Sequence, residues 1–268
     1  MPLGLQLGAL LHRVTRRPLP PSAPGSATTV RRELGVLERA GRQHNGSSCG
    51  AAVLAMVATL GDPVLEDWLL TGAVGAPRPP ELRDATRGQL EILAALPIEN
   101  RADALQRVLK RRATSITGAG FPWPGPFGTP PWGLARTARF PGVTYRQHPV
   151  DDADTRHLRE VIARIDAAST RGVPVPLYTG GDTTRGLASA VPRHVVLVVG
   201  SAPGGLRIWE PGEGRCHTVS RADLSRREPN RALGGWSRVV WVVLPVWHRV
   251  APGPPRGHDG GTAREVAT

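Results

Sequence analysis

The sequence predicts an α+β protein whose first half is helical and whose second half is rich in strands. Residues 51–60 are apolar nearly all round, as a central buried helix must be, and Gly61-Asp62-Pro63 ends the run. Residues 194–200 and 237–246 are short apolar runs rich in valine, which is typical of buried strands. We therefore expect the first run to be a central buried helix and the second half to supply an antiparallel sheet.

The ends of the chain differ in composition from the middle. Residues 1–29 read as an N-terminal segment, with a short amphipathic helix over 1–17 followed by a flexible linker rich in proline, serine and alanine. Residues 251–268 are polar and rich in glycine and proline, so they predict a disordered tail. The 268 residues are thus predicted to contain one domain, over residues 30–250.

Helices are predicted where apolar residues recur at helical spacing or where capping residues frame a run. The predicted ranges are 30–41, 49–60, 63–70, 86–96, 102–113 and 154–170, with a short helix near 222–226. Residues 118–142 are instead predicted to be a long loop without a regular element, because proline interrupts them repeatedly. Its Trp123 and Trp132 either border a cleft or only cover the core.

Strands are predicted at 143–148, 173–178, 194–200, 206–210, 215–219 and 237–246, giving an antiparallel sheet of about five strands. The prolines at 174 and 176 restrict the second of these strands to an edge, or to the side of its backbone that makes no ladder hydrogen bonds.

Cys49 lies at the junction between a polar turn and the apolar helix. Ser47 or Ser48 can cap this helix, so Cys49 falls in its first turn, where the helix dipole and unpaired amides favour a thiolate. Gln43, six residues upstream, can return over the turn and present its side-chain amide as an oxyanion donor. This pattern indicates a cysteine nucleophile.

His194 opens the most strand-like run in the sequence and is the predicted base. Glu210 ends the next strand, and a hairpin through residues 201–205 would bring its carboxylate to the second imidazole nitrogen. Asp182 is an alternative residue for orienting the imidazole. The weaker candidates for the base are His44, His148, His157 and His217.

The order Gln43, Cys49-Gly50, His194 and Glu210-Pro211 resembles that of papain-fold cysteine peptidases, and is most similar to their C39 and C39-like, bacteriocin-processing branch. The resemblance spans residues 30–245 and implies a helical half carrying the nucleophile and a sheet carrying the base. Glu210 stands where that family usually has Asp or Asn, and the Cys-Gly-Ser-Cys-Trp motif of papain itself is absent.

The composition argues against several other classes of protein, such as nucleic-acid-binding, metal-binding and membrane proteins. The net charge is +12, but Lys110 is the single lysine and the arginines are scattered, so a nucleic-acid partner is not expected. Cys49 and Cys216 are predicted to be free thiols rather than a disulfide, and no zinc spacing or cofactor motif is present. No membrane span or signal peptide is recognised, which predicts a cytoplasmic protein, or export by a route independent of such a signal.

Taken singly, each of these residues also fits a purely structural role, whereas their combination indicates a Cys-His-acid centre. The predicted function is hydrolysis of peptide or protein amide bonds, without a metal or organic cofactor. The alternatives are an acyltransferase or transglutaminase-like enzyme, an effector or toxin of the same fold, and a non-catalytic peptide-binding module. The sequence specifies neither the substrate nor the oligomeric state.

Overall fold

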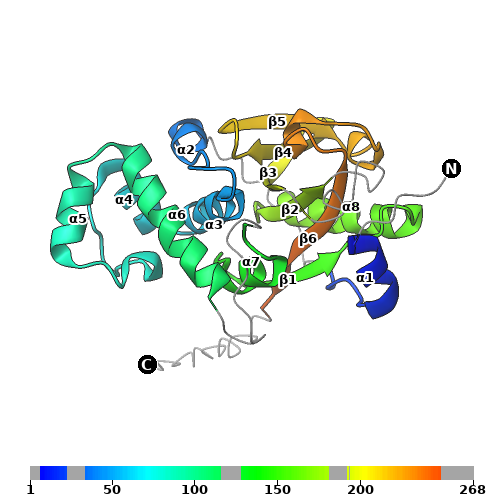
Figure 1. Ribbon diagram of the computed structural model, residues 1–268, viewed down its shortest axis with the longest axis horizontal. Helices are drawn as coiled ribbons and strands as arrows, with labels where there is room; N and C mark the ends of the chain where they lie inside the picture. The colour runs from blue at the N-terminus through cyan, green and yellow to red at the C-terminus, as the bar shows by residue number, and fades with distance from the viewer. Residues whose placement is uncertain (1–6, 23–33, 116–127, 181–191, 193, 249–268) are drawn as a thin grey trace, which may run out of the picture.

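The structure is a computed structural model that describes residues 7–22, 34–115, 128–180, 192 and 194–248. It is an α+β arrangement in which α4, α5 and α6 lie at one end and the sheet at the other, with α3 between them (Figure 1). The helices are α1 (Leu7–Thr15), α2 (Gly35–Ala40), α3 (Cys49–Gly61), α4 (Pro63–Thr71), α5 (Arg87–Ala94), α6 (Ile98–Thr114), α7 (Pro131–Thr137) and α8 (Thr155–Ser169).

The six strands of the described residues form one antiparallel sheet, in the order β1-β6-β2-β3-β4-β5. They are β1 (Val143–Pro149), β2 (Val175–Gly180), β3 (His194–Ala202), β4 (Gly205–Glu210), β5 (Arg215–Ser220) and β6 (Arg238–Trp247). The predicted count of about five was one too low, although every range predicted as a strand overlaps one. Short 3-10 helices lie at η1 (Pro80–Leu82), η5 (Asp223–Ser225) and η6 (Arg231–Leu233).

The sequence interpretation missed α7, which occupies part of the predicted proline-rich loop. Pro131 stands in the first turn of α7, where a missing backbone N–H costs no helical hydrogen bond, and Leu134 anchors the helix in the core. Residues 118–127 of that loop, with Trp123, lie outside the described residues. Proline therefore starts a helix here, although it was taken as a sign that no helix forms.

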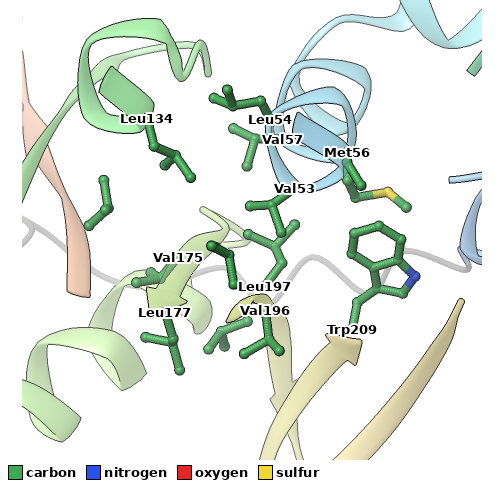
Figure 2. Packing of buried hydrophobic residues seen from close by; sticks show 14 of the residues in the cluster. Val53, Leu54, Met56, Val57, Leu134, Val175, Leu177, Val196, Leu197 and Trp209 are labelled. Carbon is green, nitrogen blue, oxygen red and sulfur yellow. The ribbon is translucent and has the colours of Figure 1, made fainter. Parts of the chain in front are cut away.

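The core lies between α3 and the sheet. Twelve consecutive residues of α3, from Cys49 to Leu60, are buried. Figure 2 shows Val53 pointing toward Leu197 of β3, and Met56 toward the indole of Trp209 on β4. Because the helix is enclosed over this whole length, its first residue is held firmly relative to the strands.

The N-terminal helix α1 packs against β1 and β6 (Figure 1). A Cβ atom on Gly8 would lie 2.3 Å from the carbonyl oxygen of Val240, so only glycine permits this approach. The proposed domain boundary at residue 30 stays a prediction, and the predicted tail lies outside the described residues.

Within the described ranges, no single helix has the length and apolar character needed to cross a membrane. Only α3 and α4 taken together reach both, and a bend of 114° separates them.

A buried arginine joins the helices at the end of the molecule away from the sheet. Arg101, at the start of α6, is 5% exposed and donates from Nε to the Leu69 carbonyl and from Nη2 to the Leu70 carbonyl, both at 2.9 Å. Its Nη1 donates at 2.5 Å to the carbonyl of Leu96. These oxygens belong to the end of α4 and to the chain just after α5, where helical partners are lacking.

Replacing Arg101 with methionine should therefore lower the free energy of unfolding by about 3 kcal/mol, because several buried carbonyls lose a charged donor. Urea denaturation measures this change. Arg87→Met is the control, since Arg87 makes only an exposed pair with Glu91 and should cost less than about 1 kcal/mol. Equal losses in the two variants would contradict this role of Arg101.

Candidate active site

The turn that leads into α3 is held by its own side chains. Ser48 Oγ accepts a hydrogen bond from the Asn45 amide at 2.9 Å, and Asn45 Oδ1 accepts one from the Ser47 amide at 3.0 Å. Ser48 is the N-cap residue by position, but its side chain makes no capping bond, contrary to the prediction that Ser47 or Ser48 caps the helix. The first-turn amides of α3, that of Cys49 included, therefore have no serine cap and can serve as donors.

One face of α6 supports the same turn. Gln106 Nε2 donates to the carbonyls of Gly41 at 3.3 Å and of Arg42 at 3.0 Å. One helical turn later, Lys110 Nζ donates to Ser47 Oγ at 2.8 Å. The loop before Cys49 is thus fixed at both of its ends.

Gly50 lets another segment cross the start of α3. A Cβ atom at this position would lie 2.6 Å from Thr129 Cβ, so any larger residue would displace Thr129. The carbonyl of Thr129 in turn accepts a hydrogen bond from Tyr178 Oη at 2.8 Å. Burial raises the pKa of the Tyr178 phenol well above its usual value, with a smaller contribution from Cys49, which places β2 close to the sulfur.

The β3–β4 hairpin brings the predicted base and acid together. His194 is the first residue of β3 and Glu210 the last of β4, and His194 Nε2 lies 2.5 Å from Glu210 Oε1. The Glu210 carboxylate is 3% exposed and accepts hydrogen bonds from the amides of Gly212 at 2.8 Å and Glu213 at 2.6 Å. Two backbone donors thus fix the carboxylate that orients the imidazole.

The imidazole of His194 also interacts with the thiol of Cys49, which is among the groups that set its pKa. Burial alone would lower the pKa of His194, but hydrogen bonds to Cys49 and Glu210, together with their Coulombic attraction, outweigh burial and raise it to about 9. Because Nε2 faces Glu210, Nδ1 is the nitrogen available to the sulfur. Burial would likewise raise the pKa of Glu210, whereas hydrogen bonds from His194, Gly212 and Glu213 outweigh it and lower that pKa.

Gln43 lies beside the turn that follows Glu210. Its backbone amide donates to the Pro211 carbonyl at 2.8 Å, which joins the loop before Cys49 to the end of β4. Its side-chain Oε1 is buried and has no hydrogen-bond partner among the described residues. Its role as an oxyanion donor stays a prediction.

The other candidates lie elsewhere or cannot be placed. His44 is more than half exposed and faces Asp103, His217 faces Glu213, and His148 and His157 are buried near α1. Asp182 lies outside the described residues. Both cysteines are free, and in Cys216 burial and the nearby Glu38 raise the thiol pKa to about 12. No cluster of three metal-ligating side chains occurs in the described part of the chain.

The sequence interpretation missed Gly234, which packs against the imidazole. A Cβ atom at Gly234 would lie 2.4 Å from Cδ2 and 2.8 Å from Nε2 of His194. The pair Gly234-Gly235 was visible as a turn signal, but nothing in it indicates which side chain would lie against it. Gly212, Thr129 and Tyr178 were missed for the same reason, since only folding brings them to the site.

Replacing Gly234 with alanine should slow the alkylation of Cys49 by iodoacetamide by about 10- to 100-fold, because the new methyl group would push His194 away from Glu210. Mass spectrometry of the alkylated protein against time measures the loss. Gly235→Ala is the matched control: both glycines have positive φ, 68° and 78°, but nothing lies within 4 Å of a Cβ at Gly235. Similar losses in both variants would assign the effect to backbone strain and contradict a contact with His194.

The fold and the site together define an α+β protein in which a cysteine at the start of a buried helix interacts with a histidine that is hydrogen-bonded to a glutamate. Comparisons with known proteins add no family to this description: no protein-family model matches the chain, and no curated protein is significantly similar to it.

Proposed function

We propose that this protein is a cysteine peptidase of papain-like fold, which hydrolyses amide bonds in peptides or proteins. The observation that carries the proposal is the hydrogen bond between His194 and Glu210, together with the interaction of the same imidazole with the thiol of Cys49. Three further features support it: the uncapped first turn of α3, the two amides that hold Glu210, and the position of Gln43 against Pro211.

The proposed chemistry is acyl transfer to water. The thiolate of Cys49 attacks the amide carbonyl carbon, and the Cys49 backbone amide and the Gln43 side chain donate hydrogen bonds to the oxyanion. The imidazolium of His194 gives its Nδ1 proton to the leaving nitrogen as the carbon–nitrogen bond breaks. His194 then removes a proton from water, which attacks the thioester carbon; the carbon–sulfur bond breaks, the acid is released, and the thiolate and imidazolium are restored.

Glu210 keeps the imidazole in the orientation and tautomer that this cycle needs. Its carboxylate accepts a hydrogen bond from the Nε2–H group throughout the cycle. Nδ1 is therefore the nitrogen that exchanges protons with the sulfur and the leaving group. The high pKa of His194 stabilises the imidazolium on which the first proton transfer depends.

A thiol-directed acyl-amide probe tests the proposal. We expect covalent labelling of the purified protein, located at Cys49 by mass spectrometry, and no labelling of Cys49→Ala. Cys216→Ala should label as the unaltered protein does, because the Cys216 thiol is mostly protonated near neutral pH at a pKa of about 12. Labelling that persists without Cys49, or that is unaffected in His194→Ala, would overturn the proposal.

A second assay separates hydrolysis from transfer to an amine. The protein is incubated with a peptide library with and without primary amines, and the products are identified by mass. Free carboxylic acids as the main products in both conditions would support a peptidase. Predominant amide products in the presence of amines would instead indicate an acyltransferase.

A further inference from the structure

A cavity of about 640 Å³ lies between α1, the residues that follow it and the first turns of α8. Its lining is rich in basic and imidazole side chains, namely His12, Arg13, Arg16, Arg17, Arg156 and His157. None of the residues that line it belongs to the proposed catalytic site. The volume is within the range of small-molecule binding sites.

The arginines of the lining differ in their ion pairs. Arg13 is bound by Asp151, with Nε and Nη2 at 2.6 Å and 3.3 Å from the carboxylate oxygens. Arg16, Arg17 and Arg156 make no ion pair with any described residue.

Part of the acidic lining is already engaged. Asp154 caps α8 and accepts hydrogen bonds from the amides of Arg156 at 2.9 Å and His157 at 3.1 Å, and Asp151 holds Arg13. Glu160 is the third carboxylate of the lining, so four arginines face three carboxylates and the lining carries one net positive charge.

Two stacked imidazoles add further polar groups to the wall. The rings of His12 and His157 lie with their centroids 3.7 Å apart and their planes at 29°. His157 is 6% exposed, and its Nε2 is buried without a hydrogen-bond partner among the described residues. A buried imidazole nitrogen without a partner is unusual in a native fold.

The backbone of the cavity lining is strained at Arg16. Arg16 has φ of 42°, and it is the only described non-glycine residue with a positive φ. Its amide donates to the His12 carbonyl at 2.8 Å, which closes α1 in the left-handed conformation that glycine usually provides. An arginine at this position is conformationally costly, so a role for its side chain would explain its presence.

We propose that this cavity binds a small soluble ligand carrying two or more phosphate groups. Guanidinium groups donate two parallel hydrogen bonds to phosphate oxygens, and Arg16, Arg17 and Arg156 make no ion pair with a described residue that would compete for these bonds. The buried Nε2 of His157 adds a further polar atom at the wall. A concave site also suits a compact soluble ligand better than a flat membrane surface.

Isothermal titration calorimetry of the full chain with tripolyphosphate, at physiological salt, tests this proposal. We expect saturable binding with one site per chain. The double variant Arg16→Gln/Arg17→Gln should bind about tenfold more weakly or worse, because two guanidinium contacts are lost. The control Arg83→Gln/Arg87→Gln removes the same charge from the α5 region, and its affinity should stay within about twofold of the unaltered protein.

The variant Arg16→Gly distinguishes an effect on ligand binding from an effect on the stability of the fold. Arg16→Gly relieves the strained backbone, so without ligand its melting temperature should equal or exceed that of the unaltered protein. Tripolyphosphate should nevertheless raise that temperature less than it does for the unaltered protein, because one ligand contact is missing.

Three results would overturn the proposal. The first is the absence of saturable binding. The second is equal weakening in the two double variants, which would reflect only the net charge of +12. The third is that the protein binds vesicles containing a phosphorylated inositol lipid but does not bind tripolyphosphate. This result would indicate that the arginines bind a membrane surface.

Discussion

Replacing Cys49 with alanine is expected to lower the rate of peptide hydrolysis by about 10⁴-fold or more, because no other group can form the thioester. His194→Ala should have an effect of similar size, since the thiol then loses both its hydrogen-bond partner and the proton donor to the leaving group. The measurement is kcat with a fluorogenic peptide selected from a library.

A variant that lacks both Cys49 and His194 tests whether the two residues act in the same catalytic step. Residues that act in one catalytic step are strongly non-additive, so Cys49→Ala/His194→Ala should be no slower than either single variant. Cys216→Ala should retain activity within about twofold, because this thiol lies on β5 opposite Trp209, outside the proposed site. Multiplied losses in the double variant would contradict a shared step.

Replacing Glu210 with glutamine is expected to lower kcat by about 10²- to 10⁴-fold. The carboxylate accepts from His194, Gly212 and Glu213 at once, whereas a carboxamide places an NH₂ group against at least one of these donors. The imidazole then loses its fixed orientation. Steady-state kinetics measure the loss, and thermal unfolding shows whether the variant remains folded.

The same variant should also change the pH dependence. In the unaltered protein, kcat/KM is expected to fall at alkaline pH with an apparent pKa of about 9, as His194 loses the proton that it gives to the leaving group. Glu210 is one of the groups that raise the pKa of His194, so Glu210→Gln should move this alkaline limb to lower pH.

Glu210→Asp is the conservative control, since it keeps the negative charge. Its alkaline limb should therefore lie closer to that of the unaltered protein than the limb of Glu210→Gln does. An alkaline limb that is identical in all three proteins would show that Glu210 does not control the protonation of His194.

Local patterns were sufficient to predict most of the secondary structure. The all-round apolar run after Cys49 forms α3, and the valine-rich runs at 194–200 and 237–246 lie within β3 and β6. These predictions succeeded because periodicity and capping act over a few residues. The α7 helix was missed because Pro131 was interpreted as a helix breaker without regard to its place in the first turn.

Part of the site geometry also followed from local reasoning. A hairpin between two adjacent strands brings their outer ends together, which is why the contact of His194 with Glu210 was expected. The contacts of Gly234, Thr129 and Tyr178 had no such signal, since each connects segments that are distant in the chain.

The sequence by itself determined that this protein has a helical half and a strand-rich half, with one cysteine where a polar turn meets an apolar helix. Tertiary structure alone decided that His194 lies against Gly234, that α6 supports the turn before Cys49, and that arginines gather in the cavity beside α8. The physical reason is that short-range propensities depend on neighbouring residues, whereas these contacts depend on how buried surfaces fit together when the whole chain packs.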